Sequence, residues 1–373
     1  MKKFKIILSV VLTIVICFLT GCTKSNNKTV DNSSLTAVDS SKNNSETIEN
    51  GLEKIKVHFI DVGQGDSIFL ELTANRTMLI DASESKYSGT IINYIKNLGY
   101  KKIDYVVATH PHADHIGGME DVIRAFDIGS VYMPKVSTNT KTFESLLKTV
   151  QSKNLKINTA KSGIKIIDEN DISIKVLSPV ADQYNNLNDY SVVLKLTYKN
   201  SKFLFMGDAE EQAEELITDD VSCDLIKLGH HGSSTSSSIE FAKKTKAKYA
   251  VISCGEGNSY GHPHKETLDR FTALGAVIYR TDINGSITAT CDGNNISILT
   301  TNKAVTPQAV HSSSESTNNN KVKYVLNTST KKIHLPECRH VSSIKTQNRT
   351  ESTKSIEELG KDGYSVCKVC IGG

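Results

Sequence analysis

The sequence of 373 residues contains no tryptophan, and its formal net charge is only +3. A charge so close to neutral does not encode an overall attraction to nucleic acid. No apolar run after Leu19 is long enough to cross a bilayer, which argues against a channel or transporter. Hydrophobic residues make up 38% of the chain, which suffices for the core of one large domain with a small one beside it.

The cysteines lack the even, regular spacing of a disulfide framework, although the chain has 8 of them. Two lie near the N-terminus, three are scattered through the central region and three lie near the C-terminus: Cys17, Cys22, Cys223, Cys254, Cys291, Cys338, Cys367 and Cys370. The sequence therefore argues against a small disulfide-stabilised scaffold. We interpret Cys223 and Cys254, which lie in strand-like apolar runs, as buried small hydrophobic residues.

The N-terminus has the pattern of an export signal. Three lysines precede the apolar run Ile6 to Leu19, which is short for a membrane span and is followed by Thr20-Gly21-Cys22. This pattern resembles bacterial lipoproteins, and it implies a signal peptide over residues 1–21 and lipidation of Cys22. An uncleaved anchor helix is the alternative, and both place the protein outside the cytoplasm, attached to the cell membrane. Residues 22–51 are rich in Asn, Ser, Thr and Lys and predict a flexible tether.

Histidine is absent between His115 and His230, yet three histidines and an aspartate lie within the six residues His110 to His115. They follow the apolar run Ile103 to Ala108, which predicts a buried strand. Imidazole and carboxylate groups suit zinc or a similar divalent ion, and histidines spaced two apart can converge on one ion. A polar surface turn is the alternative.

The rest of the central region predicts an α/β fold, because two β-rich halves are each accompanied by helical patterns. Expected strands cover 55–60, 67–72, 77–80, 103–108, 172–177, 191–198, 202–206, 224–228, 247–253 and 277–280, and expected helices cover 90–98, 209–217 and 266–274. Two packed sheets with helices outside are the arrangement that such halves favour. Candidate ligands recur at expected strand ends, namely Asp114, Asp208 and His230.

Several motifs in this region resemble a known family. The run His110-Pro111-His112-Ala113-Asp114-His115 is the HxHxDH signature of the metallo-β-lactamase superfamily. Four further motifs resemble the hydrolase-like domain of the ComEC competence channel: Phe59-Ile60-Asp61-Val62-Gly63-Gln64-Gly65-Asp66, Met206-Gly207-Asp208-Ala209, Leu228-Gly229-His230-His231-Gly232-Ser233 and Tyr260-Gly261-His262-Pro263. The resemblance covers residues 52–302. It implies a four-layer αββα sandwich that binds one or two Zn²⁺ or Mn²⁺ ions.

The resemblance also implies a division of the metal ligands. One ion would be held by His110, His112 and a bridging Asp208, and the other by Asp114, His115, Asp208 and His230. His231 would lie beside the substrate, although the sequence leaves the order of His230 and His231 open. Relatives usually supply one more histidine before the bridging aspartate, and here Asn188, Asp189 or Ser191 would fill that coordination position.

Further residues are expected around the ions. Asp114 would orient the attacking water or accept its proton, and Asp61 would orient a ligand histidine by accepting its second ring N–H. Asp66 has a less specific role. Ser233, Tyr260 and His262 would face the substrate, and His262 is a candidate proton donor to the leaving group.

The C-terminal region predicts a second metal site. Residues 303–320 are rich in Ser and Asn and predict a linker, and residues 321–373 contain four candidate ligands for a structural zinc ion, namely His334, Cys338, Cys367 and Cys370. This part resembles the metal-binding domain of the Ada DNA-repair protein, with His334 in place of a cysteine and His340 as its rival. A disulfide is the alternative. Residues 303–373 carry 11 basic and 6 acidic side chains, a net charge of +5, whereas residues 52–302 carry 27 and 31, a net charge of −4.

Taken together, the patterns predict an exported metal-dependent hydrolase. The resemblance implies a phosphodiesterase, in particular a nuclease acting on DNA at the cell surface. Two alternatives are a hydrolase of teichoic acid or its choline phosphodiesters, and a non-catalytic lipoprotein that binds DNA for uptake. The sequence names no protein partner.

Overall fold

The computed structural model describes residues 53–302, 324–335, 338, 340–354 and 356–367. The expected signal peptide (1–21), Cys22, the tether (22–51), the linker (303–320) and Cys370 lie outside the described residues. Within the described residues, every helix is too short or too polar to span a bilayer.

The larger of the two main sheets has eight strands, in the order β15-β14-β1-β2-β3-β4-β5-β6. In chain order these are β1 (Ile55–Phe59), β2 (Ile68–Glu71), β3 (Thr77–Ile80), β4 (Lys102–Val107), β5 (Asp127–Met133), β6 (Ile157–Thr159), β14 (Ile287–Cys291) and β15 (Ile296–Thr300). Strands β3 to β6 run parallel. Strand β1 pairs with β14, so the last part of this domain returns to its first strand.

The second sheet has seven strands, in the order β13-β12-β11-β10-β9-β8-β7. These are β7 (Lys165–Asp168), β8 (Ile172–Ser178), β9 (Val193–Tyr198), β10 (Ser201–Phe205), β11 (Leu225–Lys227), β12 (Tyr249–Ile252) and β13 (Val277–Arg280). Strands β10 to β13 are parallel, so their carboxyl ends lie on one edge. Such an edge is where α/β proteins place ligands.

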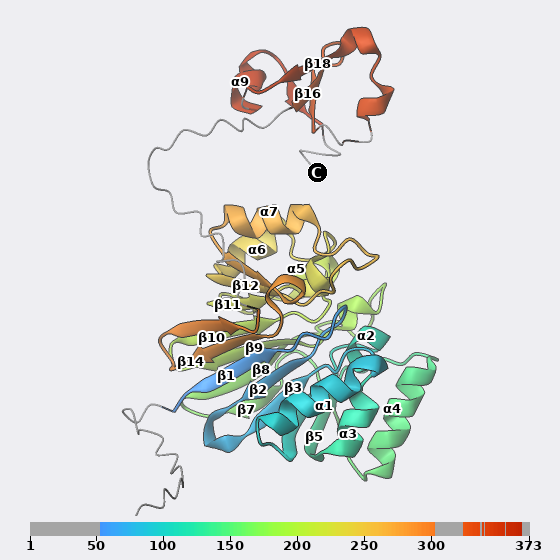
Figure 1. Ribbon diagram of the computed structural model, residues 1–373, viewed down its shortest axis with the longest axis vertical. Coiled ribbons are helices and arrows are strands. Elements are labelled where there is room, and N and C mark those ends of the chain that lie inside the picture. Colours follow the sequence, from blue (N-terminus) through green and yellow to red (C-terminus); the bar gives the residue numbers. More distant parts are fainter. Residues whose placement is uncertain (1–52, 303–323, 336–337, 339, 355, 368–373) are drawn as a thin grey trace, which may run out of the picture. The chain divides into compact units, whose positions relative to one another are not determined.

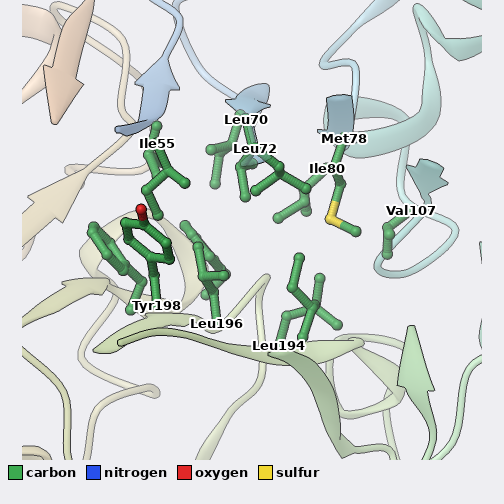
Figure 2. Close-up of a cluster of buried hydrophobic side chains, with 14 of the residues drawn as sticks. Ile55, Leu70, Leu72, Met78, Ile80, Val107, Leu194, Leu196 and Tyr198 are labelled. Atoms are coloured by element: carbon green, nitrogen blue, oxygen red, sulfur yellow. The ribbon is translucent and has the colours of Figure 1, made fainter. Parts of the chain in front are cut away.

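The alternation of side chains along the strands builds the layers. In β2, Ile68 and Leu70 point into the core between the sheets, and Phe69 packs on the opposite face. In β9, Leu194 and Leu196 enter the same central core. Figure 2 shows side chains of the first sheet, including Ile55, Leu70, Met78 and Ile80, facing Leu194, Leu196 and Tyr198 of the second.

Helices cover the outer face of each sheet (Figure 1). On the first sheet these are α1 (Ser88–Asn97), α2 (Ala113–Ile116), α3 (Met119–Ala125) and α4 (Lys141–Ser152), and on the second α5 (Glu211–Leu216), α6 (Ile239–Thr245) and α7 (Lys265–Ala273), while the short α8 (Thr281–Asn284) follows β13. The expected four-layer αββα sandwich is therefore confirmed.

The C-terminal residues form a separate four-stranded sheet, in the order β18-β16-β17-β19. Its elements are β16 (Tyr324–Asn327), β17 (Lys332–His334), β18 (Arg349–Ser352), α9 (Ile356–Lys361) and β19 (Ser365–Val366). Two small buried clusters, one of which contains Cys338 and Cys367, support this sheet. A fold with so little apolar surface needs a further source of stability.

Candidate metal centre

The candidate ligands of the main domain meet at the ends of strands from both sheets. The loop after β4 carries His110 to His115, the turn after β10 carries Asp208, and the turn after β11 carries His230 and His231. His112, Asp114, Asp208, His230 and His231 among them border a cavity of about 330 Å³. Its lining residues are Gln64, His112, Ala113, Asp114, Asn188, Asp208, His230, His231, Tyr260 and His262.

A glycine turn supports the histidine loop from behind. Gly65 has φ +139°, and a Cβ atom there would lie 2.5 Å from the carbonyl oxygen of Asp114. The next residue, Asp66, donates its backbone N–H to that same carbonyl at 3.1 Å. Only a residue without a side chain permits this approach, so the glycines between β1 and β2 hold the ligand loop in place.

The two adjacent histidines after β11 have an uncommon backbone. His230 and His231 have φ of +46° and +53°, inside the 3₁₀ turn Gly229–Gly232. Residues other than glycine seldom adopt this left-handed region, and two in succession carry a conformational cost. The turn brings both imidazole rings to the cavity, with centroids 6.2 Å apart.

Asp208 lies between two groups of imidazoles, and each of its oxygens faces one group. Oδ1 is 3.2 Å from His115 Nε2 and 3.6 Å from His231 Nε2. Oδ2 is 3.8 Å from both His110 Nε2 and His230 Nε2. A carboxylate that presents separate oxygens to separate donor groups is suited to bridge two cations.

The donors on the Oδ1 side form a compact group. One atom from each of Asp114, His115, Asp208 and His231 lies within 4.8 Å of the others. His115 Nε2, His231 Nε2 and Asp208 Oδ1 are buried without a hydrogen-bond partner. Buried polar atoms left without a partner carry a free-energy cost, and a divalent ion would remove it. These residues therefore fit a metal ion.

On the other side, His110 and His112 provide a second pair of converging ring nitrogens. His110 Nε2 lies 3.0 Å from His112 Nδ1. Their spacing of two residues brings the two rings together, with centroids 4.7 Å apart, as the sequence predicted, and His112 lines the cavity. Imidazoles paired in this way suit zinc, copper, iron or a similar ion.

Hydrogen bonds behind the rings fix which nitrogen faces the cavity. Asp81 Oδ2 lies 2.8 Å from His115 Nδ1, and the same carboxylate accepts from the backbone N–H and hydroxyl of Thr109. Asp81 therefore holds the His115 ring with Nε2 directed at the site. Asp61 was expected to play this role, and that prediction is wrong: Asp61 is exposed and accepts from the N–H of Gly63, because its position beyond β1 favours a turn contact.

His231 is oriented in the same way. Its Nδ1 lies 3.0 Å from the carbonyl oxygen of Ser253 and 3.3 Å from Asp66 Oδ1. Asp66 in turn pairs with the fully buried Lys227, whose Nζ lies 2.8 Å from Oδ2. The expectation that His231 lies beside the substrate and His230 in the group with His115 is therefore corrected: it is His231 that belongs to that group.

The charges of the site shift its titrations strongly. Burial disfavours a charge on His115 and His231, but the carboxylates outweigh it: Asp208 and Asp81 hold the pKa of His115 well above its usual value, and Asp208 and Asp114 raise that of His231 to about 9. Burial disfavours charge on Asp208 also, yet His115 and His231 hold its pKa well below the usual range. Protons and metal ions would therefore compete for these rings.

Of the three residues expected to fill the missing coordination position, Asp189 and Ser191 are bonded elsewhere, and Asn188 remains a candidate. The carboxylate of Asp189 accepts the backbone N–H groups of Glu210 and Ala213. Ser191 Oγ lies 3.3 Å from His110 Nδ1, on the side of the ring away from the ion group, and accepts from the N–H of Asp208. Asn188 borders the cavity, and its amide nitrogen donates to Glu210 while its Oδ1 is buried without a partner.

Of the three residues expected to face the substrate, Tyr260 and His262 line the cavity and Ser233 does not. Tyr260 is 65% exposed and its ring stacks on that of His262. Burial, followed by the charges of His230 and His231, lowers the pKa of His262 to about 4, so this imidazole is neutral at neutral pH. Ser233 is buried and bonds to Thr235 at 3.0 Å, and it does not line the cavity.

A second group of ligands lies in the C-terminal sheet. His334, Cys338 and Cys367 are buried and place one donor atom each within 4.8 Å of the others. His334 Nδ1 is 3.4 Å from Cys338 Sγ, whereas the rival His340 is exposed. Two sulfur atoms and one imidazole in this arrangement suit a tetrahedral zinc ion with one more ligand.

The comparisons with known proteins agree with this geometry. A family model described as the metallo-beta-lactamase superfamily matches residues 60–256, more than half of the chain. The chain belongs to the metallo-β-lactamase superfamily. The HxHxDH loop, Asp208 and the two histidines after β11 all lie within the matched residues.

Within this superfamily the chain is similar to competence proteins. "ComE operon protein 3" of Bacillus subtilis (strain 168) is 29% identical over 252 residues, which cover 62% of this chain and 32% of that protein. "Competence protein ComA" of Neisseria gonorrhoeae is 28% identical over 232 residues, which cover 61% of this chain and 31% of that protein. The chain thus spans about a third of the length of these curated relatives.

Among solved structures, the chain is similar to the metallo-beta-lactamase fold protein YhfI from Bacillus subtilis. It is 14% identical, the match covers 61% of this chain and 95% of that one, and the TM-score is 0.42.

Three residues that support the site were not predicted as site residues. Asp81 was recognised only as the end of an expected strand, although a carboxylate at the end of a buried strand is itself a signal. Lys227 is a charged residue between apolar neighbours in the expected strand 224–228, which could have indicated a buried ion pair. Glu210 gave no comparable signal, because it was one of several acids at the start of an expected helix.

Proposed function

We propose that this chain is a metal-dependent phosphodiesterase that acts on DNA outside the cytoplasm. The observation that supports this most directly is the position of Asp208, whose two oxygens face two separate groups of imidazoles. Two neighbouring cations are the arrangement that many phosphodiester-cleaving enzymes use to steady the attacking and leaving oxygens. The similarity to competence proteins supports DNA as the substrate.

Divalent cations in this site would lower the pKa of a water molecule and polarise a phosphoryl oxygen. The chain itself supplies the geometry of that reaction. Asp114 is partly exposed at the cavity, with Oδ2 3.3 Å from His231 Nε2, so its second oxygen can orient a water or accept a proton. His262, being neutral, can hydrogen-bond to the phosphodiester, and this role replaces the proton donation expected from the sequence.

The cellular location is part of the proposal. The lipobox before Cys22 supports a lipid anchor at that residue, and the Asn- and Ser-rich stretch 22–51 supports a tether between the membrane and the enzyme. A Cys22→Ser variant should then appear in the medium, whereas the parent chain should fractionate with the membrane. Recovery of both in the same fraction would overturn the anchor.

The C-terminal module is proposed to hold a structural zinc ion through His334, Cys338, Cys367 and Cys370. The three ligands among the described residues already converge. The net charge of +5 over residues 303–373 supports a secondary role in attracting the phosphates of the substrate. Deleting residues 321–373 should then lower the salt dependence of DNA binding, and an unchanged dependence would exclude that role.

The test of the main proposal uses residues 22–373 with Mn²⁺ or Zn²⁺ and three substrates: plasmid DNA, bis(p-nitrophenyl) phosphate and teichoic acid. Asp208→Ala should abolish cleavage, because it removes the residue shared by both donor groups, a loss of several kcal/mol or roughly a thousandfold in rate. The matched control is Asp182→Ala, which removes an exposed carboxylate that pairs only with Lys161 among its described contacts.

The outcomes separate the candidate functions. Metal-dependent cleavage of DNA that Asp208→Ala removes supports the nuclease. Cleavage of teichoic acid with intact DNA would assign the enzyme to the cell wall instead. Retention of DNA without cleavage of any substrate, under every metal, would show a binding lipoprotein and contradict the proposal.

A further inference from the structure

The group of donors around His110 has one residue fewer than the group around His115: it contains His110, His112 and Asp208, whereas the other contains Asp114, His115, Asp208 and His231. No histidine occurs between residues 115 and 230, and the candidate replacements Asp189 and Ser191 are directed elsewhere. Among the residues that the sequence assigned to this side, an ion would have His110, His112 and Asp208 as ligands, and the amide oxygen of Asn188 is the one candidate left in the stretch 188–191. The chain does, however, place a second histidine next to His231.

His230 faces this deficient side of the site. Its Nε2 lies 3.8 Å from Asp208 Oδ2, the same oxygen that His110 Nε2 approaches at 3.8 Å. The adjacent His231 instead directs its Nε2 to Oδ1 and to Asp114. Two neighbouring histidines are therefore divided between the two oxygens of one carboxylate, and the left-handed backbone at both positions makes this division possible.

A carboxylate behind the ring fixes the nitrogen that His230 presents. Glu210 Oε1 lies 2.9 Å from His230 Nδ1. Glu210 is itself held by donors from Thr235, Asn186 and Asn188. With its Nδ1–H donated to Glu210, the ring carries its free electron pair on Nε2, which is the nitrogen near Asp208. This carboxylate–imidazole arrangement is the one that orients metal-binding histidines.

We propose that His230 is the third imidazole ligand of the ion bound by His110, His112 and Asp208, and that Glu210 is the residue that positions it. The pair His230-His231 thereby serves both ions, one histidine each. This proposal shares with the function proposed above only the requirement that divalent ions bind. The role that it assigns to His230 follows neither from the HxHxDH motif nor from the order of His230 and His231 in the sequence.

The experiment counts ions in the full mature chain, residues 22–373, loaded with Mn²⁺. This hard ion avoids the thiolates of the C-terminal group, so the count reports the main domain. The variants are His230→Asn and the matched His231→Asn, because asparagine tolerates the left-handed backbone at both positions. Titration calorimetry gives the affinities, and electron paramagnetic resonance separates coupled from isolated Mn²⁺.

The parent chain should bind two coupled ions, and each single variant should keep one isolated ion, whose retention shows that the fold is intact. The double variants provide the decisive comparison. His230→Asn combined with His112→Asn should still bind one ion, since both residues serve the same ion. His230→Asn combined with His231→Asn should bind none.

The proposal would be overturned if His230→Asn still bound two coupled ions with the affinity of the parent chain. It would also be overturned if the parent chain bound one ion and His230→Asn bound that ion with the same affinity. If that variant fails to fold, Glu210→Gln provides the test. The affinity for the ion bound by His110, His112 and Asp208 should fall roughly 10- to 100-fold, and an unchanged affinity overturns the assignment. A different result would contradict the function proposed above: a chain that binds both ions and cleaves no phosphodiester.

Discussion

The two ligand groups of this chain differ in what surrounds them. The main-domain group is placed on strand ends between extensive cores, and it borders an open cavity of about 330 Å³. The C-terminal group, His334, Cys338 and Cys367, is itself part of a small buried cluster. Its donors are mainly sulfur, whereas the main-domain donors are nitrogen and oxygen.

This difference indicates what a metal ion would contribute in each place. Open positions and mixed nitrogen and oxygen ligands are typical of catalytic sites, and closed sulfur-rich groups are typical of structural zinc. In the main domain, carboxylates and protonated imidazoles can balance one another without an ion. We therefore expect the main domain to fold without metal and the C-terminal module to depend on it.

The largest expected effect tests that dependence. Cys338→Ser should unfold the C-terminal module, because binding of a structural zinc ion contributes about 10 kcal/mol or more to the folding of small zinc modules. Hydrogen-exchange mass spectrometry should show lost protection in β16 and β17 and unchanged protection in β1 to β4. His340→Ala, which removes an exposed imidazole of the same module, is the control. If β16 and β17 keep full protection from hydrogen exchange in a metal-free Cys338→Ser chain, the C-terminal module does not depend on metal more than the main domain does.

The second prediction concerns the buried ion pair behind His231. Lys227→Met should destabilise the main domain by about 3–5 kcal/mol, because it leaves the buried carboxylate of Asp66 without its cation. Urea unfolding followed by circular dichroism measures the change. The double variant Lys227→Met/Asp66→Asn should recover most of the stability. If the single variant is as stable as the parent, the main domain does not depend on this charge balance.

The sequence predicted the layers well because their signals are local. Alternation in stretches such as 55–60 and 191–198 reflects burial of one face, and the HxHxDH loop carries its chemistry within six residues. The hairpin of β14 and β15 was not predicted, although β14 completes the first sheet beside β1. That pairing joins residues more than two hundred positions apart, and no local pattern encodes it.

The details of the site were harder to predict, since they depend on backbone angles and on distant partners. His230 and His231 are chemically alike and adjacent, and their left-handed backbone together with the partners of each Nδ1 determines which oxygen of Asp208 each one faces. Asp61 and Asp81 both follow strands of the same sheet. The contact with His115 falls to Asp81 because β3 lies next to β4, which leads into the histidine loop.

The third prediction concerns a contribution to the pH dependence of the main domain's stability that does not come from its metal ligands. Burial of Glu214 in α5 raises its pKa from 4.5 to about 7. The folded state therefore binds more protons than the unfolded state between these values, so this carboxyl lowers stability as pH rises through that window. The total loss is about 3 kcal/mol at most, from a shift of about 2.5 units.

Glu214→Gln should remove this pH-dependent loss, because an amide carries no charge at any pH. Its single oxygen can accept from only one of the N–H groups of Ser237 and Ser238, which the two carboxylate oxygens accept separately, and the cost of the lost bond does not change with pH. The variant should therefore gain stability over the parent progressively between pH 4.5 and 7.5, measured by urea unfolding at each pH. Glu215→Gln, on the exposed side of the same helix, is the control. If the difference in the free energy of unfolding between variant and parent does not change with pH, the ionisation of Glu214 is not its source.

The smallest expected effect lies in the hydrogen bond behind His115. Asp81→Asn keeps a residue that tolerates the left-handed backbone at this position, where φ is +58°. Its amide would face His115 Nδ1 with an N–H group where the carboxylate accepted one. The ring would then carry its proton on Nε2, the nitrogen directed at Asp208 Oδ1, and would lose its free electron pair as a ligand. Calorimetry should show metal affinity reduced roughly 10- to 100-fold.

The control for this change is Asp104→Asn, a carboxylate of the same sheet that accepts from the backbone N–H of Thr77. It should leave the metal affinity unchanged. The C-terminal group has no carboxylate among its convergent ligands, so its zinc affinity should be insensitive to Asp81→Asn. If Asp81→Asn leaves the main-domain affinity at the parent value, the ring of His115 is held by its packing alone, and the two metal groups differ less than their surroundings indicate.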